Sequence, residues 1–179
     1  MLGTIPSRRW GLSMAESLRN FQAEVKPEWI DLNGHMTFWA YSKMFNESAN
    51  AYLSEAGINE QIGAGQCSAL HTSQCHVKFL HESFAGDRVV IEFQMLGYDD
   101  KRIHVFQRMR NRDTGVILAV EESVKSNLAD QEASPFSLRE RSFHPKIQER
   151  IALLMKQHEN APWPAEAGAA IRLPSVLID

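Results

Sequence analysis

The sequence contains little cysteine. Cys67 and Cys75 are the two cysteines in 179 residues. Both fall in one stretch whose pattern predicts a strand, where they would lie roughly 26 Å apart at about 3.3 Å per residue. Two thiols so far apart cannot form a bond, so a fold held together by disulfides is not expected. A reducing cytoplasm is the expected compartment.

An excess of positive charge and long hydrophobic runs are also lacking. The formal net charge is -3 and the pI is near 6.2. Such a chain has no general field that attracts nucleic acid or an anionic membrane, and neither is an expected partner. The first twenty residues hold no apolar run of seven or more, so neither a secretory signal nor a membrane span is expected there.

Several motifs of well-known chemistries are missing. The sequence has no G-x-S-x-G elbow, no P-loop and no G-x-G-x-x-G fingerprint. His71, His76 and His81 recur every five residues, but an odd spacing on a strand turns His76 to the opposite face. No zinc-ligand spacing is met, so neither a metal nor another cofactor is expected.

The length and the 44% hydrophobic content suit one globular domain with tails. We expect a mobile arm over 1–19, a domain over 20–130, and a C-terminal extension over 131–179. The alternation of apolar and polar residues over 21–26 predicts a half-buried strand, which Pro27 ends or bends.

One helix has a strong pattern. Its apolar stripe has continuous helical spacing and consists of Tyr41, Met44, Phe45, Ser48, Ala49, Tyr52, Leu53 and Ala56. Gly57 follows, where a C-terminal glycine is typical.

Strand-like segments follow over 67–80, 88–98, 101–111 and 116–128, separated by turn signals. Their alternation predicts an antiparallel meander with one face on a core. Pro145 can open a last helix through about Gln157. The predicted class is α+β, with an antiparallel sheet wrapped around a long helix.

The stretch "DLNGHMT", residues 31–37, places polar residues directly before that helix. Unpaired N–H groups and the dipole at a helix N-terminus suit a developing oxyanion. A carboxylate beside them, here Asp31, can attack a carbonyl or deprotonate an attacking water. Asn33 and Gly34 suit a turn, His35 can orient the carboxylate or the loop, and Thr37 can cap the helix. Taken locally, the same residues are also typical of ordinary capping and turn structure.

Asp31 and His35, followed six residues later by Tyr41 on a long helix, resemble the 4-hydroxybenzoyl-CoA thioesterase-like branch of the hotdog superfamily. The downstream string "VKFLHESFAGDRVVIEF" resembles the same branch, and the resemblance covers about 20–130. It implies a hotdog fold, a homodimer or homotetramer, and acyl-CoA thioester hydrolysis at the subunit interface. By this resemblance Asp31 matches the catalytic carboxylate, and the backbone N–H near Thr37 or Phe38 matches the oxyanion donor.

The motif departs from the commonest form, which reads His-Val-Asn-Asn where this chain has "HMTF". This departure leaves the substrate open. The strings "WIDLNGHMT", "HVKFL" and "DDKRIHVF" are more similar to the thioesterase modules of carnitine catabolism, which hydrolyse betainyl-CoA.

Aromatic residues crowd the motif, and aromatic faces bind trimethylammonium groups at about 0.5 to 2 kcal/mol each. The expected substrate-binding residues are Trp29, Phe38, Trp39, Tyr41 and Phe45, with His76 from a neighbouring strand. Taken singly, Tyr41 and Phe45 are better explained as core residues. The cations expected to bind the CoA phosphates are Lys78, Arg88, Lys101 and Arg102.

Two other functions stay open from the sequence. A hotdog hydratase or dehydratase would pair a histidine with a carboxylate, and Glu47 pointing into the pocket would favour it. A module that binds acyl-CoA without chemistry is the second, because a fold does not dictate a function.

Overall fold

The computed structural model describes residues 20–59, 69–128 and 140–168. The elements are β1 (Asn20–Glu24), the 3-10 helix η2 (Pro27–Trp29), α1 (Phe38–Glu55), β2 (Ala69–Phe79), β3 (Arg88–Tyr98), β4 (Arg102–Asn111), β5 (Ile117–Leu128) and α2 (Pro145–His158). The predicted helices and strands are confirmed, each with shifts of a few residues at its ends. The short helix η2 was not predicted.

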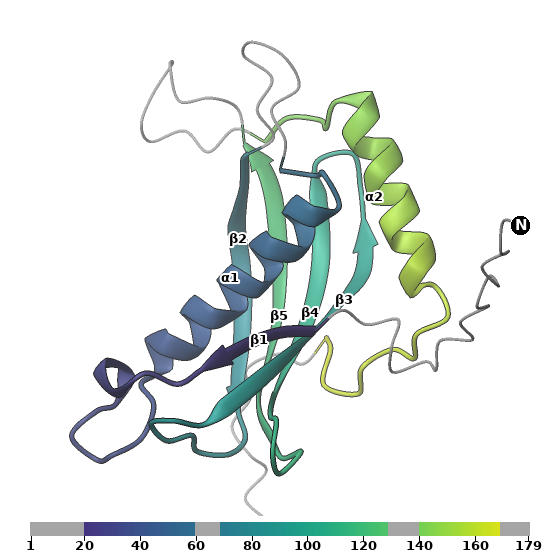
Figure 1. Cartoon of the computed structure of the whole chain (residues 1–179). Coiled ribbons are helices and arrows are strands. Elements are labelled where there is room, and N and C mark those ends of the chain that lie inside the picture. The colour runs from purple at the N-terminus through teal and green to yellow at the C-terminus, as the bar shows by residue number, and fades with distance from the viewer. Residues whose placement is uncertain (1–19, 60–68, 129–139, 169–179) are drawn as a thin grey trace, which may run out of the picture.

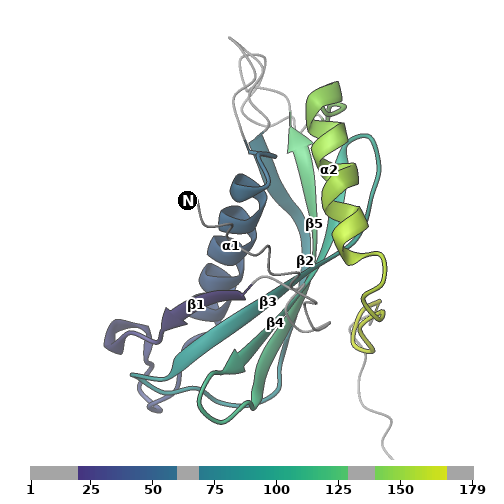
Figure 2. The same cartoon turned by 45° about the vertical axis from the view of Figure 1, so that its right-hand side comes forward.

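The strands form one antiparallel sheet in the order β1-β3-β4-β5-β2. Helix α1 crosses one face of this sheet, as Figures 1 and 2 show. Its buried residues include Tyr41, Met44, Phe45 and Leu53, which belong to the stripe predicted from the spacing. The predicted sheet wrapped around a long helix is therefore confirmed.

The register explains which side chains face α1. Directly paired residues of antiparallel strands point to the same face of the sheet. Ile91 of β3 pairs with Met109 of β4, which pairs with Ala119 of β5, and all three are buried against the start of α1. Strand β2 pairs with β5 and lies at the edge of the sheet, so the predicted meander is confirmed for β3, β4 and β5 but is wrong for β2.

Helix α2 extends this core at the other end of α1. Ile147, Ile151 and Leu154 are buried with Leu53 of α1 and Phe93 of β3 in one apolar cluster. Figure 1 shows α2 beside β3, at the end of the molecule away from the loop that enters α1. Within the described residues, no helix combines the length and the apolar character needed to cross a membrane.

A histidine lies inside this second cluster. His158 is 2% exposed, its Nδ1 accepts the Met95 N–H at 3.0 Å, and its Nε2 lies 3.2 Å from the Tyr52 hydroxyl. Burial lowers the pKa of His158 to about 4. The neutral ring is the form that fits this site.

We expect the pKa of His158 to make stability depend on pH. Between pH 6.5 and 4 the unfolded chain binds a proton on this histidine and the folded chain does not. The free energy of unfolding should therefore fall as the pH drops through this window, by on the order of 2 to 3 kcal/mol from this group. Urea unfolding of wild type and His158→Gln at pH 7 and pH 4.5 checks this. The variant should lose less stability between the two pH values, and equal losses would contradict the assignment.

Candidate active site

A tight loop precedes α1. The Asp31 N–H donates to the His35 carbonyl at 2.9 Å and the Gly34 N–H donates to the Asp31 carbonyl at 3.0 Å. Ile30 and Met36 form a short antiparallel bridge that closes the loop. Gly34 has a φ of +84°, a left-handed conformation that residues with a Cβ rarely adopt. The turn predicted from Asn33 and Gly34 therefore depends on the glycine.

The Asp31 carboxylate organises this loop. Its Oδ1 accepts the backbone N–H of Asn33 at 2.8 Å and of His35 at 3.3 Å. These two hydrogen bonds, the Asn33 bond first, lower the pKa of Asp31 below its ordinary value. The side chain is exposed and therefore carries its negative charge at neutral pH.

The N-terminus of α1 lacks a side-chain cap. Thr37 is the N-cap residue, as predicted, but its hydroxyl makes no capping bond and donates instead to the Trp29 carbonyl at 3.0 Å. The Thr37 N–H donates to the same carbonyl at 2.9 Å. Thr37 is therefore not the free oxyanion donor that the sequence allowed. Within the described part of the chain, the N–H groups of Phe38 and Trp39 have no recorded acceptor.

The imidazole of His35 is directed to residues other than Asp31. Its Nε2 lies 3.2 Å from the Glu82 carboxylate, and its ring packs edge-on against Phe84. The contact with Asp31 is made by the His35 backbone N–H, so His35 supports the loop through its main chain. The ring is held toward the segment that follows β2.

A cavity of about 350 Å³ opens beside this loop. The ring of Tyr41 packs edge-on against Phe79 with 5.1 Å between the ring centroids, and the Tyr41 hydroxyl donates to the His81 carbonyl. Burial raises the pKa of Tyr41 to about 12, so the hydroxyl keeps its proton. The lining residues are His35, Met36, Phe38, Tyr41, Phe79, Leu80, His81 and Glu82. Asp31 lies in the same loop as His35 but is not among them.

The predicted aromatic residues divide into two groups. Phe38 is 72% exposed and Trp39 is 44% exposed at the start of α1. Trp29 and Phe45 are buried in the core, so neither ring is open to a ligand. Phe45 is therefore a core residue and not a substrate-binding residue in this structure.

The other predicted contacts do not gather at the loop. His76 pairs with Glu122 of β5 and lies with His104 and Glu122 around another cavity, on the face of the sheet away from α1. His76 does not face α1, because the alternation of β2 gives that face to Val77 and Phe79. Its predicted contact with the substrate stays a prediction.

The predicted CoA-binding cations are also dispersed. Arg88 pairs with Asp113, and Arg102 lies near Asp99 and Glu140. Lys101 and Arg102 lie at the β3–β4 turn, at the end of the sheet away from the loop before α1 (Figure 1). Lys78 is exposed on β2, one residue before Phe79. These four side chains do not form one cluster within a single copy of the chain.

The sequence reasoning missed Phe79, His81 and Glu82 as parts of the cavity. Phe79 and Leu80 belong to the string "HVKFL", which had been noted for the resemblance alone. Which residues of the strand end would contact α1 depends on the order of the strands, which no local pattern shows. Glu47 is exposed on α1 and pairs with Lys43, one turn earlier, rather than entering this cavity.

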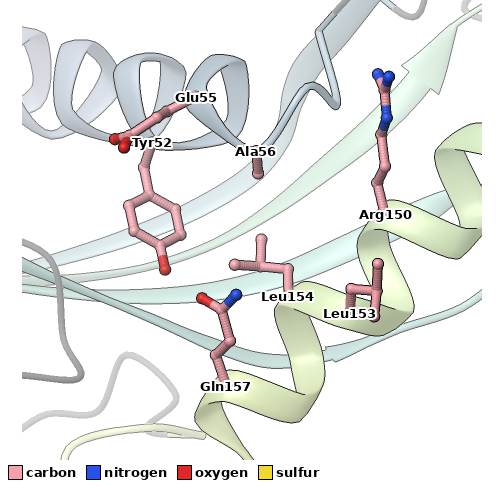
Figure 3. A pocket seen from close by; sticks show the side chains of 7 residues that line it. All are labelled: Tyr52, Glu55, Ala56, Arg150, Leu153, Leu154 and Gln157. Carbon is pink, nitrogen blue, oxygen red and sulfur yellow. The ribbon is translucent and has the colours of Figure 1, made fainter. Parts of the chain in front are cut away.

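A second cavity, of about 240 Å³, lies between the C-terminal part of α1 and α2. Figure 3 shows Tyr52 and Glu55 on α1 and Leu154 and Gln157 on α2 around it. Because α1 has eighteen residues, this cavity is roughly 25 Å from the loop at about 1.5 Å per residue. It is a separate site from the one at Asp31.

Comparisons with known proteins agree with this geometry. The model of the thioesterase-like superfamily matches residues 25–171. The chain belongs to this superfamily. It is 31% identical to a betainyl-CoA thioesterase of Pseudomonas aeruginosa over 91% of this chain and 99% of that protein. It is also 33% identical to an L-carnitine dehydrogenase/betainyl-CoA thioesterase of Agrobacterium fabrum, over 87% of this chain but 30% of that longer protein.

A solved structure supports the fold. A Staphylococcus aureus protein in complex with CoA superimposes with a TM-score of 0.76 at 24% identity, covering 88% of this chain and 96% of that one. The predicted hotdog fold and the resemblance to the 4-hydroxybenzoyl-CoA thioesterase-like branch are confirmed. This member of the thioesterase-like superfamily is a thioester hydrolase.

We expect Gly34→Ala to destabilise the Asp31 loop. A Cβ at this position meets no atom within 4 Å, so the cost comes from the left-handed backbone and not from a clash. That cost should be about 1 to 2 kcal/mol in the free energy of unfolding, measured in urea. The control is Gly97→Ala, where the Cβ also has open space and φ is not positive. Equal costs for the two variants would show that the left-handed turn is not needed.

Proposed function

We propose that this thioesterase hydrolyses a small acyl-CoA in the cytoplasm, betainyl-CoA in particular, to the free acid and CoA. Asp31 acts as nucleophile or general base, and the first N–H groups of α1 form the oxyanion hole. One observation carries this proposal. An ionised carboxylate and an uncapped helix N-terminus are fixed together by the bonds of the Asp31 loop and the two bonds from Thr37 to Trp29.

The chemistry follows from that arrangement. The thioester carbonyl accepts hydrogen bonds from Phe38 N–H and Trp39 N–H, which stabilise the negative charge that develops on its oxygen. Asp31 either removes a proton from the attacking water or attacks the carbonyl carbon to give an anhydride that water then cleaves. In both routes the carbon–sulfur bond breaks and CoA leaves as the thiolate. No cofactor takes part.

The acyl group fits the aromatic entrance. Phe38 and Phe79 line the cavity and are about half exposed or more, and Trp39 is the next residue of α1. Their faces suit a trimethylammonium group. The betainyl-CoA thioesterase of Pseudomonas aeruginosa, which this chain matches over nearly the whole length of both, supports this choice of substrate.

We also propose that the active unit is a homodimer formed through β2. This strand is eleven residues long, pairs with β5 along one edge, and has no partner on the other edge among the described residues. A long free edge is a surface for pairing with another strand. A second copy would bring its own basic side chains, such as Lys78, toward the CoA phosphates.

Asp31→Asn should lower kcat/KM for betainyl-CoA by about two orders of magnitude or more. Asparagine keeps an oxygen that can accept the N–H groups of Asn33 and His35, so the loop is retained and the negative charge is lost. CoA release is followed with a thiol reagent, and thermal unfolding of both proteins confirms that the variant stays folded.

If the variant hydrolyses the thioester as fast as wild type, Asp31 is only a loop and cap residue. Binding of acyl-CoA without turnover by the wild type would instead indicate a binding module. Addition of water to an enoyl-CoA would indicate the hydratase.

Trp39→Leu and Phe38→Leu should each lower the preference for betainyl-CoA over its uncharged isostere, 3,3-dimethylbutanoyl-CoA. Each aromatic face is expected to contribute about 0.5 to 2 kcal/mol to that preference. The ratio of the two kcat/KM values is the measurement. Trp163→Leu is a matched control, because Trp163 is 60% exposed and packs near His104, on the face of the sheet away from α1. If wild type hydrolyses betainyl-CoA and its uncharged isostere with equal kcat/KM, the aromatic residues do not contribute to substrate preference.

A further inference from the structure

Polar side chains interrupt the apolar face of the sheet under α1. Gln107 of β4 pairs with Glu121 of β5, which pairs with Val77 of β2, so all three point toward the helix. Gln107 is 0%, Glu121 4% and Ser123 2% exposed. The rows on either side of them on β3 and β4 are apolar, for example Ile91 with Met109.

These groups form a small network against the helix backbone. Gln107 Nε2 donates to the Phe45 carbonyl at 3.0 Å and to Glu121 Oε1 at 3.3 Å. Ser123 Oγ donates to the same Glu121 oxygen at 3.1 Å. Gln107 Oε1 is buried and has no hydrogen-bond partner among the described residues. An unpaired buried acceptor costs about 1 to 3 kcal/mol, which a purely structural network would avoid.

Among the described residues no cation forms an ion pair with Glu121, although the charge of the buried Lys125 acts on it. Lys125 Nζ donates to Thr72 Oγ1 at 2.7 Å and to Asn46 Oδ1 at 3.5 Å, and no ion pair joins it to Glu121 within the described part of the chain. Burial raises the pKa of Glu121 and lowers the pKa of Lys125, and in each case the charge of the other group acts against that shift. A further positive charge, brought in by a ligand, would add to the effect of Lys125 and favour the ionised carboxylate.

The network lies about one turn of α1 beyond the cavity at the Asp31 loop, and its residues do not line that cavity. Phe79 contacts Tyr41 at the entrance. Val77, opposite Glu121, is two residues along β2 from Phe79, and Phe45, bound by Gln107, is four residues along α1 from Tyr41. The distance from Phe79 to Val77 along β2 and the distance from Tyr41 to Phe45 along α1 are each about 6 Å. Both lead away from the oxyanion donors. An acyl group that enters at Phe38 and follows α1 therefore points toward Glu121.

We propose that Glu121, held by Gln107 and Ser123, is the anionic end of the acyl pocket and selects acyl groups that carry a positive charge. This inference rests on the proposed function and assigns its substrate specificity to a residue outside the Asp31 loop. The exposed Cys75 of β2 lies close to this network, because it pairs with Ser123, whose hydroxyl donates to Glu121.

The test compares wild type, Glu121→Gln and Glu47→Gln on cationic thioesters and their uncharged isosteres. The cationic substrates are betainyl-CoA and 4-(trimethylammonio)butanoyl-CoA, and in each isostere a carbon replaces the nitrogen. Glu47→Gln removes the same charge from the exposed side of α1 and should behave as wild type. Glu121→Gln should lower the ratio of kcat/KM for the cationic over the uncharged substrate at least tenfold and leave the uncharged substrate within about threefold. An unchanged ratio for both chain lengths overturns the proposal.

If the wild type hydrolyses none of these thioesters, the proposed function fails. A binding measurement then still tests the role of Glu121. Choline and its uncharged isostere 3,3-dimethylbutan-1-ol are compared as protectants of Cys75 against alkylation, read by mass spectrometry of the Cys75 peptide. Choline should protect in wild type and at least tenfold less well in Glu121→Gln. Equal protection by the two compounds, or no protection by choline, overturns the assignment.

Discussion

The carbonyl of Trp29 sets the geometry of the active site. It accepts both the N–H and the hydroxyl of Thr37, so the chain that leaves β1 is fastened to the first residue before α1. A threonine at this position would otherwise cap the helix with its hydroxyl. Because that hydroxyl is engaged elsewhere, the next N–H groups have no acceptor among the described residues, and the Asp31 loop precedes them directly.

The position of the N-terminus of α1 depends in turn on the burial of this helix against the sheet. Tyr41, Met44 and Phe45 pack on β3 and β4, and Trp29 belongs to the same apolar cluster. Hydrophobic burial of this size fixes the axis and rotation of a helix, so the direction of its N–H groups follows from the core. A loop that binds through backbone groups gains its precision from such a rigid support.

In the proposed mechanism, two groups of residues act at opposite ends of the acyl group. The Asp31 loop and the N-terminus of α1 would act on the carbonyl, where charge develops during the reaction. Glu121, held by Gln107 and Ser123, would act on the far end of the acyl group, where charge stays constant. An interaction made equally with the bound substrate and the transition state distinguishes one acyl group from another without altering the chemical step.

The sequence by itself determined the elements, because the spacing of apolar residues reports which face of a helix or strand is buried. It also determined the glycine turn and the place of Asp31 before α1, since both depend on neighbours within a few residues. Only the tertiary structure decided the order of the strands, and with it the contacts of Phe79, the turning of His76 to the other face and the burial of Trp29. These depend on pairings between residues far apart along the chain, for which no local pattern carries a signal. The same holds for Glu121. In the sequence it is one of two adjacent glutamates, and only the positions of β4 and α1 show that it is buried.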